Sequence, residues 1–174
     1  PIGSRGLGDV YKRQILWLGW FGFNGGSVLS ADPALTSLTL VTTCLAAAAG
    51  GIGAAVFSRF LYKNLDLTMF MNGVLGGLVG ITAGADQMLP TSAIFIGLVA
   101  GIIVVLSVAL LDKCKLDDPV GAIPVHLFCG IWGTLAVGLV GEMAGFEQFM
   151  VQLACVGITL SLIHISEPTR PYWI

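Results

Sequence analysis

A single histidine, His126, lies inside the long uncharged run from Pro119 to Gly141. Imidazole titrates near neutral pH, so it can take up and release a proton under physiological conditions. An ionisable residue within an apolar span normally faces the interior of a helix bundle or a cavity. If the helix starts at Asp118, a rise of about 1.5 Å per residue places His126 roughly 12 Å into the span, near the bilayer midplane. We therefore favour a pore or proton-relay role for His126 over simple packing.

The residues just ahead of His126 predict how this helix begins. Asp118 followed by Pro119 is typical of an N-cap and a first-turn proline, and Asp117 is close enough to interact with the same helix end. We favour this capping role for both carboxylates; the alternative is that one of them holds a neighbouring helix or the inner mouth of a pore. Pro124 removes a backbone donor and frees a carbonyl, which predicts a locally distorted helix that lines a cavity.

A second cluster is the stretch WFGFNGGS, from Trp20 to Ser27. Trp20 and Phe23 are three residues apart, and Phe23 and Ser27 are four apart, so the three side chains share one helix face. Aromatic faces attract cations, and a hydroxyl can hydrogen-bond them. The alternative is an aromatic belt at a membrane interface, which the stretch taken alone favours at least as much.

The elements that carry these residues are predicted to be membrane helices. Hydrophobic residues make up 56% of the chain and charged residues 10%, and there are 24 glycines. Uncharged intervals of about 20 residues are long enough to cross a bilayer. Four intervals meet this length: Pro33 to Ser58, Leu67 to Ala85, Gln87 to Leu111 and Pro119 to Gly141. The outer intervals, Ile15 to Ala31 and from Gln148 onward, look cut short, and glycines four residues apart predict close helix packing. The fold class is therefore an all-α polytopic transmembrane bundle.

Both ends of the chain are predicted to be foreign to this membrane protein. Residues 1–14, PIGSRGLGDVYKRQ, can be encoded by a DNA string whose reverse complement translates as LSLIHISEPTRPYW, the sequence of residues 160–173. Such an inverted repeat is similar to translated transposon-type sequencing-adapter DNA, which must be excluded from fold reasoning. The alternative, an amphipathic anchor at each end, requires this complementarity by chance. We expect residues 15–159 to be a partial membrane domain, residues 1–14 and 160–174 to be adapter-derived, and His164 to be no partner for His126.

Four basic residues remain between these ends: Arg59, Lys63, Lys113 and Lys115. They all lie in two alternate loops, 58–66 and 112–118, so the positive-inside tendency places these loops in the cytoplasm. The net charge of −2 offers no basic stripe for nucleic acid. The four cysteines form no CxxC pair and have no histidine at metal-ligand spacing, so we expect neither a metal nor a cofactor.

Four segments together resemble the ammonium transporter (Amt) family, in its Amt branch rather than among its Rh relatives. They are GWFGFNGGS (Gly19 to Ser27), AAAAGG (Ala46 to Gly51), GLVGITAGA (Gly77 to Ala85) and DDPVGAIPVHLFCGIWGTLAVGL (Asp117 to Leu139). The resemblance implies about eleven spans in two inverted repeats around a pore, in each subunit of a homotrimer. This chain would supply the end of the sixth span to the start of the eleventh.

The resemblance also implies roles for single residues. Ser27 matches the hydroxyl of the outer recruitment site, Phe23 one of two stacked gate phenylalanines, and Trp20 a tryptophan of the pore wall. His126 matches the second member of the twin-histidine pair. Their partners, including the first histidine, would lie upstream of this chain.

The function implied is ammonium or methylammonium transport across the plasma membrane, and not enzymatic catalysis. A desolvated cation costs tens of kcal/mol, whereas an aromatic face returns about 2 kcal/mol, so the pore must conduct ammonia and pass the proton separately. A PII-type cytoplasmic regulator is a further expectation of the resemblance. The alternatives are a membrane sensor of ammonium within a signalling protein and a polytopic scaffold that conducts nothing.

Overall fold

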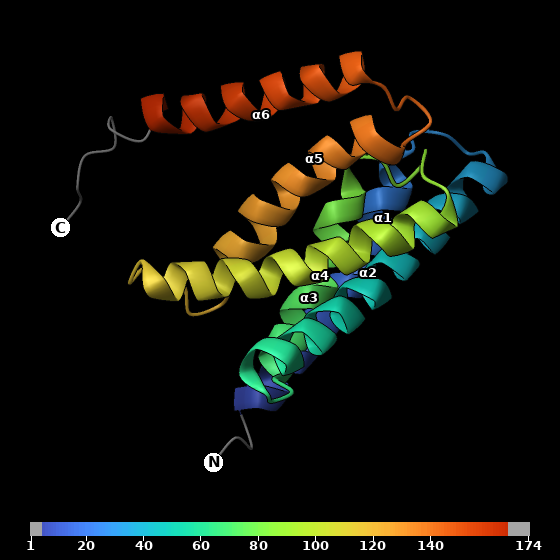
Figure 1. The fold of residues 1–174 in the computed structure, drawn as a ribbon. Coiled ribbons are helices and arrows are strands. Elements are labelled where there is room, and N and C mark those ends of the chain that lie inside the picture. Colours follow the sequence, from blue (N-terminus) through green and yellow to red (C-terminus); the bar gives the residue numbers. More distant parts are fainter. Residues whose placement is uncertain (1–4, 167–174) are drawn as a thin grey trace.

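The computed structural model describes residues 5–166, which fold as helices joined by short loops (Figure 1). The helices are α1 (Arg5–Ser27), α2 (Pro33–Tyr62), α3 (Leu67–Thr82), α4 (Pro90–Lys113), the π-helix η1 (Ile123–Phe128), α5 (Cys129–Val140) and α6 (Phe146–Ser166). Asp32 and Asp66 start α2 and α3, because their side chains accept hydrogen bonds from backbone N–H groups of the first helical turn. No strand occurs among the described residues. The all-α fold class is confirmed.

Three helical segments are long and apolar enough to cross a membrane: α2, α4 and the continuous pair η1 and α5. Helix α3 is apolar but has only 16 residues, so the expectation that Leu67 to Ala85 forms one full-length span is wrong. The helix ends at Thr82, and the following residues form turns in which Gly84 N–H donates to the Ile81 carbonyl and Gln87 N–H donates to the Gly84 carbonyl. The residues that directly follow the helix, Ala83 to Ala85, are uncharged, so hydropathy did not separate them from it.

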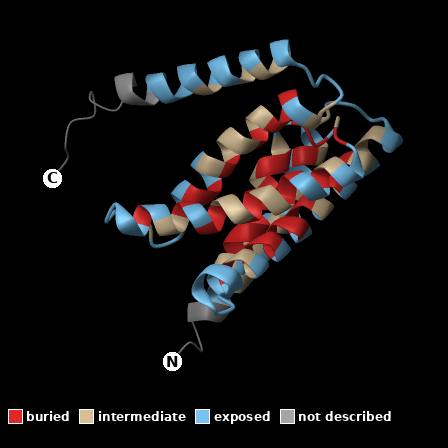
Figure 2. Ribbon diagram, in the orientation of Figure 1, coloured by how far each residue is buried: buried red, intermediate tan, exposed pale blue. Residues whose placement is uncertain are grey.

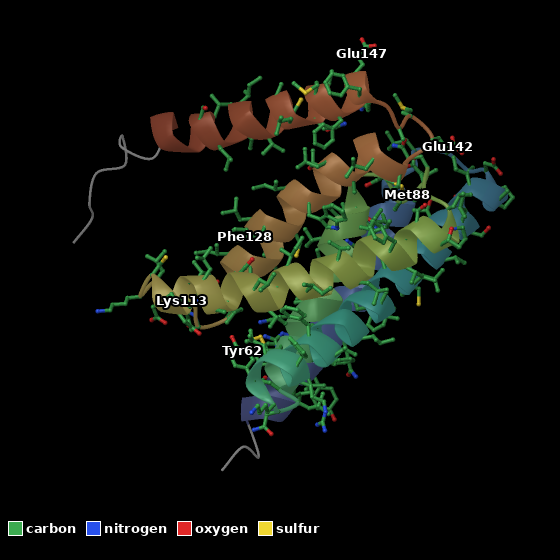
Figure 3. The ribbon with its side chains drawn as sticks, in the orientation of Figure 1. Tyr62, Met88, Lys113, Phe128, Glu142 and Glu147 are labelled. Carbon is green, nitrogen blue, oxygen red and sulfur yellow. The ribbon has the colours of Figure 1, made fainter. Side chains whose placement is uncertain are left out.

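The loops alternate between the two ends of the bundle (Figure 1). Tyr62 and Lys113, the last residues of α2 and α4, lie at one end, and Met88 and Glu142 lie at the other (Figure 3). At that second end, Glu142 N–H donates to the Gln87 carbonyl at 3.3 Å, which ties the two loops together. The predicted loops 58–66 and 112–118 begin too early in the sequence, because α2 and α4 continue to Tyr62 and Lys113.

The packing centre lies where α2 contacts both α3 and α4, and buried residues concentrate there (Figure 2). Glycines make this close approach possible. A Cβ atom added to Gly77 of α3 or to Gly97 of α4 would collide with the Ala46 carbonyl of α2, and one added to Gly101 would collide with the Gly50 carbonyl. The prediction that glycines four residues apart let helix backbones touch is confirmed for these helices.

Helix α1 borders this centre, whereas α6 contacts only α5 among the described helices. Helix α1 packs on α2 and α3, and its residues Trp17 and Trp20 contact a buried cluster that includes Val125 and Cys129. Helix α6 packs on α5, where a Cβ on Gly138 would lie 2.6 Å from the Phe149 Cα. Most of the described α6 residues are otherwise exposed (Figure 2).

Candidate functional site

The predicted residues of α1 lie together on one face near its C-terminal end. The Trp20 and Phe23 rings have centroids 5.8 Å apart and planes inclined by 56°. The Trp20 indole N–H donates to the Thr82 hydroxyl of α3 at 2.8 Å, which fixes the ring. Phe23 is 60% exposed, and the Ser27 hydroxyl donates to the Phe23 carbonyl at 2.7 Å. Trp20 is thus anchored to the bundle, whereas Phe23 and Ser27 are exposed.

Asn24 lies between these residues in the sequence and was not predicted to matter. Its side chain is only 3% exposed, and its Nδ2 donates to the Thr43 hydroxyl of α2 at 2.9 Å. Its Oδ1 is buried and has no hydrogen-bond partner within residues 5–166. An amide in an apolar helix is costly unless it is paired, so Asn24 could have been found from its chemistry alone.

Asn24 and Ser27 border a hollow of about 200 Å³ at the end of the bundle that carries Met88 and Glu142 (Figure 3). Its lining comes from α1, α2, the end of α3 and the loop after α3: Asn24, Ser27, Val28, Thr39, Thr82, Ala83, Ala85 and Asp86. Polar side chains from four separate segments therefore meet here. No sequence pattern indicated Thr39, Thr82 or Asp86, because only the fold brings these distant parts of the chain to one hollow.

His126 lies on η1, where the helix is distorted as Pro124 predicts. The backbone N–H of Cys129 is bonded to the carbonyls of both His126 and Pro124, and the wider bond to Pro124 is that of a π-helix. The helix begins at Ile123, so His126 lies in its first turn, and the count of eight helical residues from Asp118 is wrong. The depth of about 12 Å that rests on this count therefore does not hold.

His126 is exposed and borders two hollows. One, of about 210 Å³, separates η1 and α5 from α6 and includes Thr134 and Thr159 in its lining. The other, of about 250 Å³, lies toward α1, with Leu16 and Leu75 in its lining. Within the described part of the chain, His126 contacts none of Trp20, Phe23 and Ser27 through a hydrogen bond or a ring contact. The side chain of His164 lies outside the residues that the structure describes.

Asp118 caps the start of η1 from the preceding turn. Its two carboxylate oxygens accept hydrogen bonds from the Ala122 and Ile123 N–H groups at 3.0 and 2.8 Å. Partial burial acts to raise the pKa of this carboxyl, but the backbone N–H donors outweigh it, so the pKa is lowered from its ordinary value. Pro119 lies in the turn and not in the first helical turn, because Gly121 with φ of 73° reverses the chain first. Asp117 is exposed and does not share the cap.

The family model described as Ammonium Transporter Family matches residues 13–166. The chain belongs to the ammonium transporter family. A relative from Synechocystis sp. that carries an ammonium-transporter name is 53% identical over 131 residues, which cover 72% of this chain and 30% of the relative. The ammonium transporter Amt2 of Archaeoglobus fulgidus is 45% identical over 133 residues, covering 76% of this chain and 28% of the relative. This chain thus spans about 30% of the length of the curated relatives that it matches.

Solved structures agree with this placement in the family. A structure titled Sensor Amt Protein has a TM-score of 0.84 and 34% identity over 87% of this chain and 40% of its own. Mep2 of Saccharomyces cerevisiae has a TM-score of 0.80 and 28% identity over 87% of this chain and 38% of its own. The chain is therefore an integral membrane segment with the helix arrangement of this family.

Proposed function

We propose that the full-length protein transports ammonium, and that it conducts ammonia and passes the proton separately. The observation that carries the proposal is His126, an exposed imidazole on a distorted helix start that borders two hollows in an apolar bundle. An imidazole with access to a cavity can exchange protons with a passing ammonium ion. Family membership supports ammonium as the substrate.

The residues of α1 form the outer part of the proposed pathway. The Phe23 ring and the Ser27 hydroxyl are exposed at the same helix face, and Trp20 is held behind them by Thr82. Aromatic faces return about 2 kcal/mol to a cation, which suffices for attraction but not for passage of a charged ion through an apolar pore. We propose that the remaining pore wall, including the first histidine of the pair, belongs to the part of the full-length protein that precedes this segment.

The proposal is tested in a chimera of the Archaeoglobus fulgidus Amt2 in which residues 15–159 of this chain replace the matching segment. Replacing His126 by Ala removes the proton acceptor, so transport should fall about 100-fold or more. Uptake of labelled methylammonium into proteoliposomes and ammonium-dependent currents measure the effect. Leu127→Ala, in the adjacent exposed residue of the same hollow, serves as the control and should retain uptake. Wild-type rates and ion selectivity in His126→Ala would exclude the relay role.

A second candidate function is ammonium sensing. The structural similarity to the Sensor Amt Protein favours it, because this likeness extends over 87% of the chain. The transport and sensing roles share the same membrane helices and differ in the domain attached after the last span. Extending the coding DNA beyond the C-terminal residues decides between them, since a signalling domain at that position supports sensing.

We further propose that residues 1–14 and 160–174 are translated adapter sequence, and that the natural segment is 15–159. The proposal is supported by the finding that a DNA string encoding residues 1–14 has a reverse complement that encodes residues 160–173. Residues 1–4 and 167–174 lie outside the described structure. The segment by itself should give no methylammonium uptake in liposomes, because most of the pore wall is supplied by other residues. Resequencing the source DNA across both junctions tests the adapter origin directly.

The assembly and placement of the full-length protein are proposed from the same family membership. We propose a homotrimer in the plasma membrane, with the loops after α2 and α4 in the cytoplasm because they carry Lys63 and Lys115. A PII-type regulator would then act on that face. Cross-linking of the full-length protein in membranes and labelling of cysteines introduced into these loops check the two statements.

A further inference from the structure

Two threonines in the bundle each pass a hydrogen bond from a side chain of α1 to the backbone of their own helix. Thr82 accepts from the Trp20 indole and donates to the Leu78 carbonyl at 2.7 Å. Thr43 accepts from the Asn24 amide and donates to the Thr39 carbonyl at 2.6 Å. A hydroxyl has a single hydrogen, so once that hydrogen is given to a carbonyl, the oxygen can only accept.

This arrangement fixes which way the Asn24 amide faces. The two ends of an asparagine amide are similar in shape, and the partner decides which end is presented. Because the Thr43 oxygen can only accept, it must receive the Nδ2 donor of Asn24. The Oδ1 acceptor is then left as the buried atom without a partner in the described structure.

The hollow of about 200 Å³ that Asn24 lines is called the outer hollow below, and its other polar side chains are all placed to accept hydrogen bonds. The Ser27 hydroxyl gives its hydrogen to the Phe23 carbonyl, and the Thr39 hydroxyl gives its hydrogen to the Leu35 carbonyl. Asp86, at the rim, is exposed and contributes carboxylate oxygens. With the hydroxyl hydrogens committed to carbonyls of their own helices, these groups offer lone pairs to a ligand. Such a site suits a cation that carries N–H donors.

We propose that Thr43 is a positioning residue that holds the Asn24 carbonyl oxygen as a cation acceptor at the outer hollow. Asn24 is then a specificity-determining residue for small cations with N–H donors, namely ammonium and methylammonium. The inference rests on the proposed transport function and adds two residues to it. Without the Thr43 hydroxyl, the amide is free to turn its NH₂ group outward, where it opposes a cation.

The experiment uses the Amt2 chimera and compares Thr43→Val, Thr43→Ser and Asn24→Leu. Valine keeps the shape of threonine but cannot accept a hydrogen bond, so Thr43→Val should raise the KM for methylammonium about tenfold or more, with a smaller change in kcat. Thr43→Ser restores the acceptor and should stay within about threefold of the unsubstituted chimera. Thr36→Val is the matched control on the same helix, because the Thr36 side chain makes no hydrogen bond within residues 5–166.

A double-variant measurement separates positioning from general structural damage. If Thr43 acts through Asn24, then Asn24→Leu should raise the KM by a similar factor, and adding Thr43→Val to it should raise the KM no further. Multiplying effects in the double variant, or an unchanged KM in a folded Thr43→Val chimera, overturns the inference.

Failure of the proposed function gives a different result from failure of this inference. If the unsubstituted chimera takes up no methylammonium, the transport proposal is what fails. The amide orientation is then decided by nuclear magnetic resonance of the 174-residue chain in lipid. The Asn24 side-chain amide signal, identified by its loss in Asn24→Leu, should shift in Thr43→Val and not in Thr36→Val. An unchanged signal in Thr43→Val contradicts the hydrogen-bond assignment.

Discussion

Two regions of the molecule differ in how their key residues are placed. In the packing centre of α2, α3 and α4 these residues are buried in close contacts, whereas on the face that carries α1 and η1 they are exposed. In the centre, backbones touch through glycines, and Ala46 and Gly50 of α2 are met from both sides. On the α1 and η1 face, the candidate pathway residues Phe23, Ser27 and His126 are exposed. The contacts of the first region join helices of this chain, whereas the second region exposes its aromatic and polar side chains. Small residues thus allow α2, α3 and α4 to pack closely, and hydrogen bonds from α2 and α3 then orient Trp20 and Asn24 of α1.

Substitutions in the two regions should have different consequences. A close backbone contact cannot relax around an added methyl group, because the carbonyl it meets is held by its own helix. A site side chain on an open face can be replaced with little loss of packing. Substitutions in the centre should therefore change stability, and substitutions on the face should change transport.

The largest expected effect in the centre comes from Gly97→Ala. The added Cβ would collide with the Ala46 carbonyl, so we expect a loss of about 3 kcal/mol or a failure to fold. Thermal unfolding of the purified chain in detergent measures it. Gly130→Ala is the matched control, because a Cβ there lies 3.9 Å from the Val79 side chain and alanine favours a helix. Equal melting temperatures for the two variants would break the proposed contrast between the regions.

A smaller effect is expected where the centre adjoins the outer hollow. The buried Thr42 hydroxyl lies 2.6 Å from the Ala85 carbonyl and joins α2 to the turn after α3. Thr42→Val removes this donor and leaves the carbonyl unpaired, so unfolding should become easier by about 1 kcal/mol. The melting temperature checks this expectation. Thr159→Val, which loses only a bond to its own helix on exposed α6, should change stability less than Thr42→Val does.

The smallest expected effect concerns the helix start ahead of His126 and depends on pH. The pKa of Asp118 is lowered in the folded state, so its carboxylate stabilises the fold above its ordinary pKa of 3.8. That contribution disappears as the pH falls through the lowered folded pKa. Asp118→Ala should therefore lower stability by about 0.5 kcal/mol at pH 7, and by less at acid pH.

Melting temperatures of Asp118→Ala and the unsubstituted chain, measured from pH 7 down to about pH 2, test this dependence. Asp117→Ala is the matched control, because Asp117 makes no cap contact. If the difference in melting temperature between the Asp118→Ala and unsubstituted chains stays constant over the whole pH range, the carboxylate does not act through its charge.

Much of the fold could be predicted because hydropathy and spacing are properties of the chain itself. The uncharged runs located the membrane helices, and Pro124 predicted the distorted start of η1. The end of α3 could not be predicted, since the residues that directly follow it, Ala83 to Ala85, are as uncharged as the helix. The site was predictable only where neighbouring residues share a face, as Trp20 and Phe23 do.

The sequence by itself determined that this is a membrane helix bundle of the ammonium transporter family, with basic loops on one side and a lone histidine in an apolar run. The tertiary structure decided which polar atoms meet. Trp20 and Thr82 are 62 residues apart, and Asn24 and Thr43 are 19 apart, so no local pattern pairs them. The physical reason is that hydropathy depends on each residue's own surface, whereas the direction of a hydrogen bond depends on how its partner is already bonded.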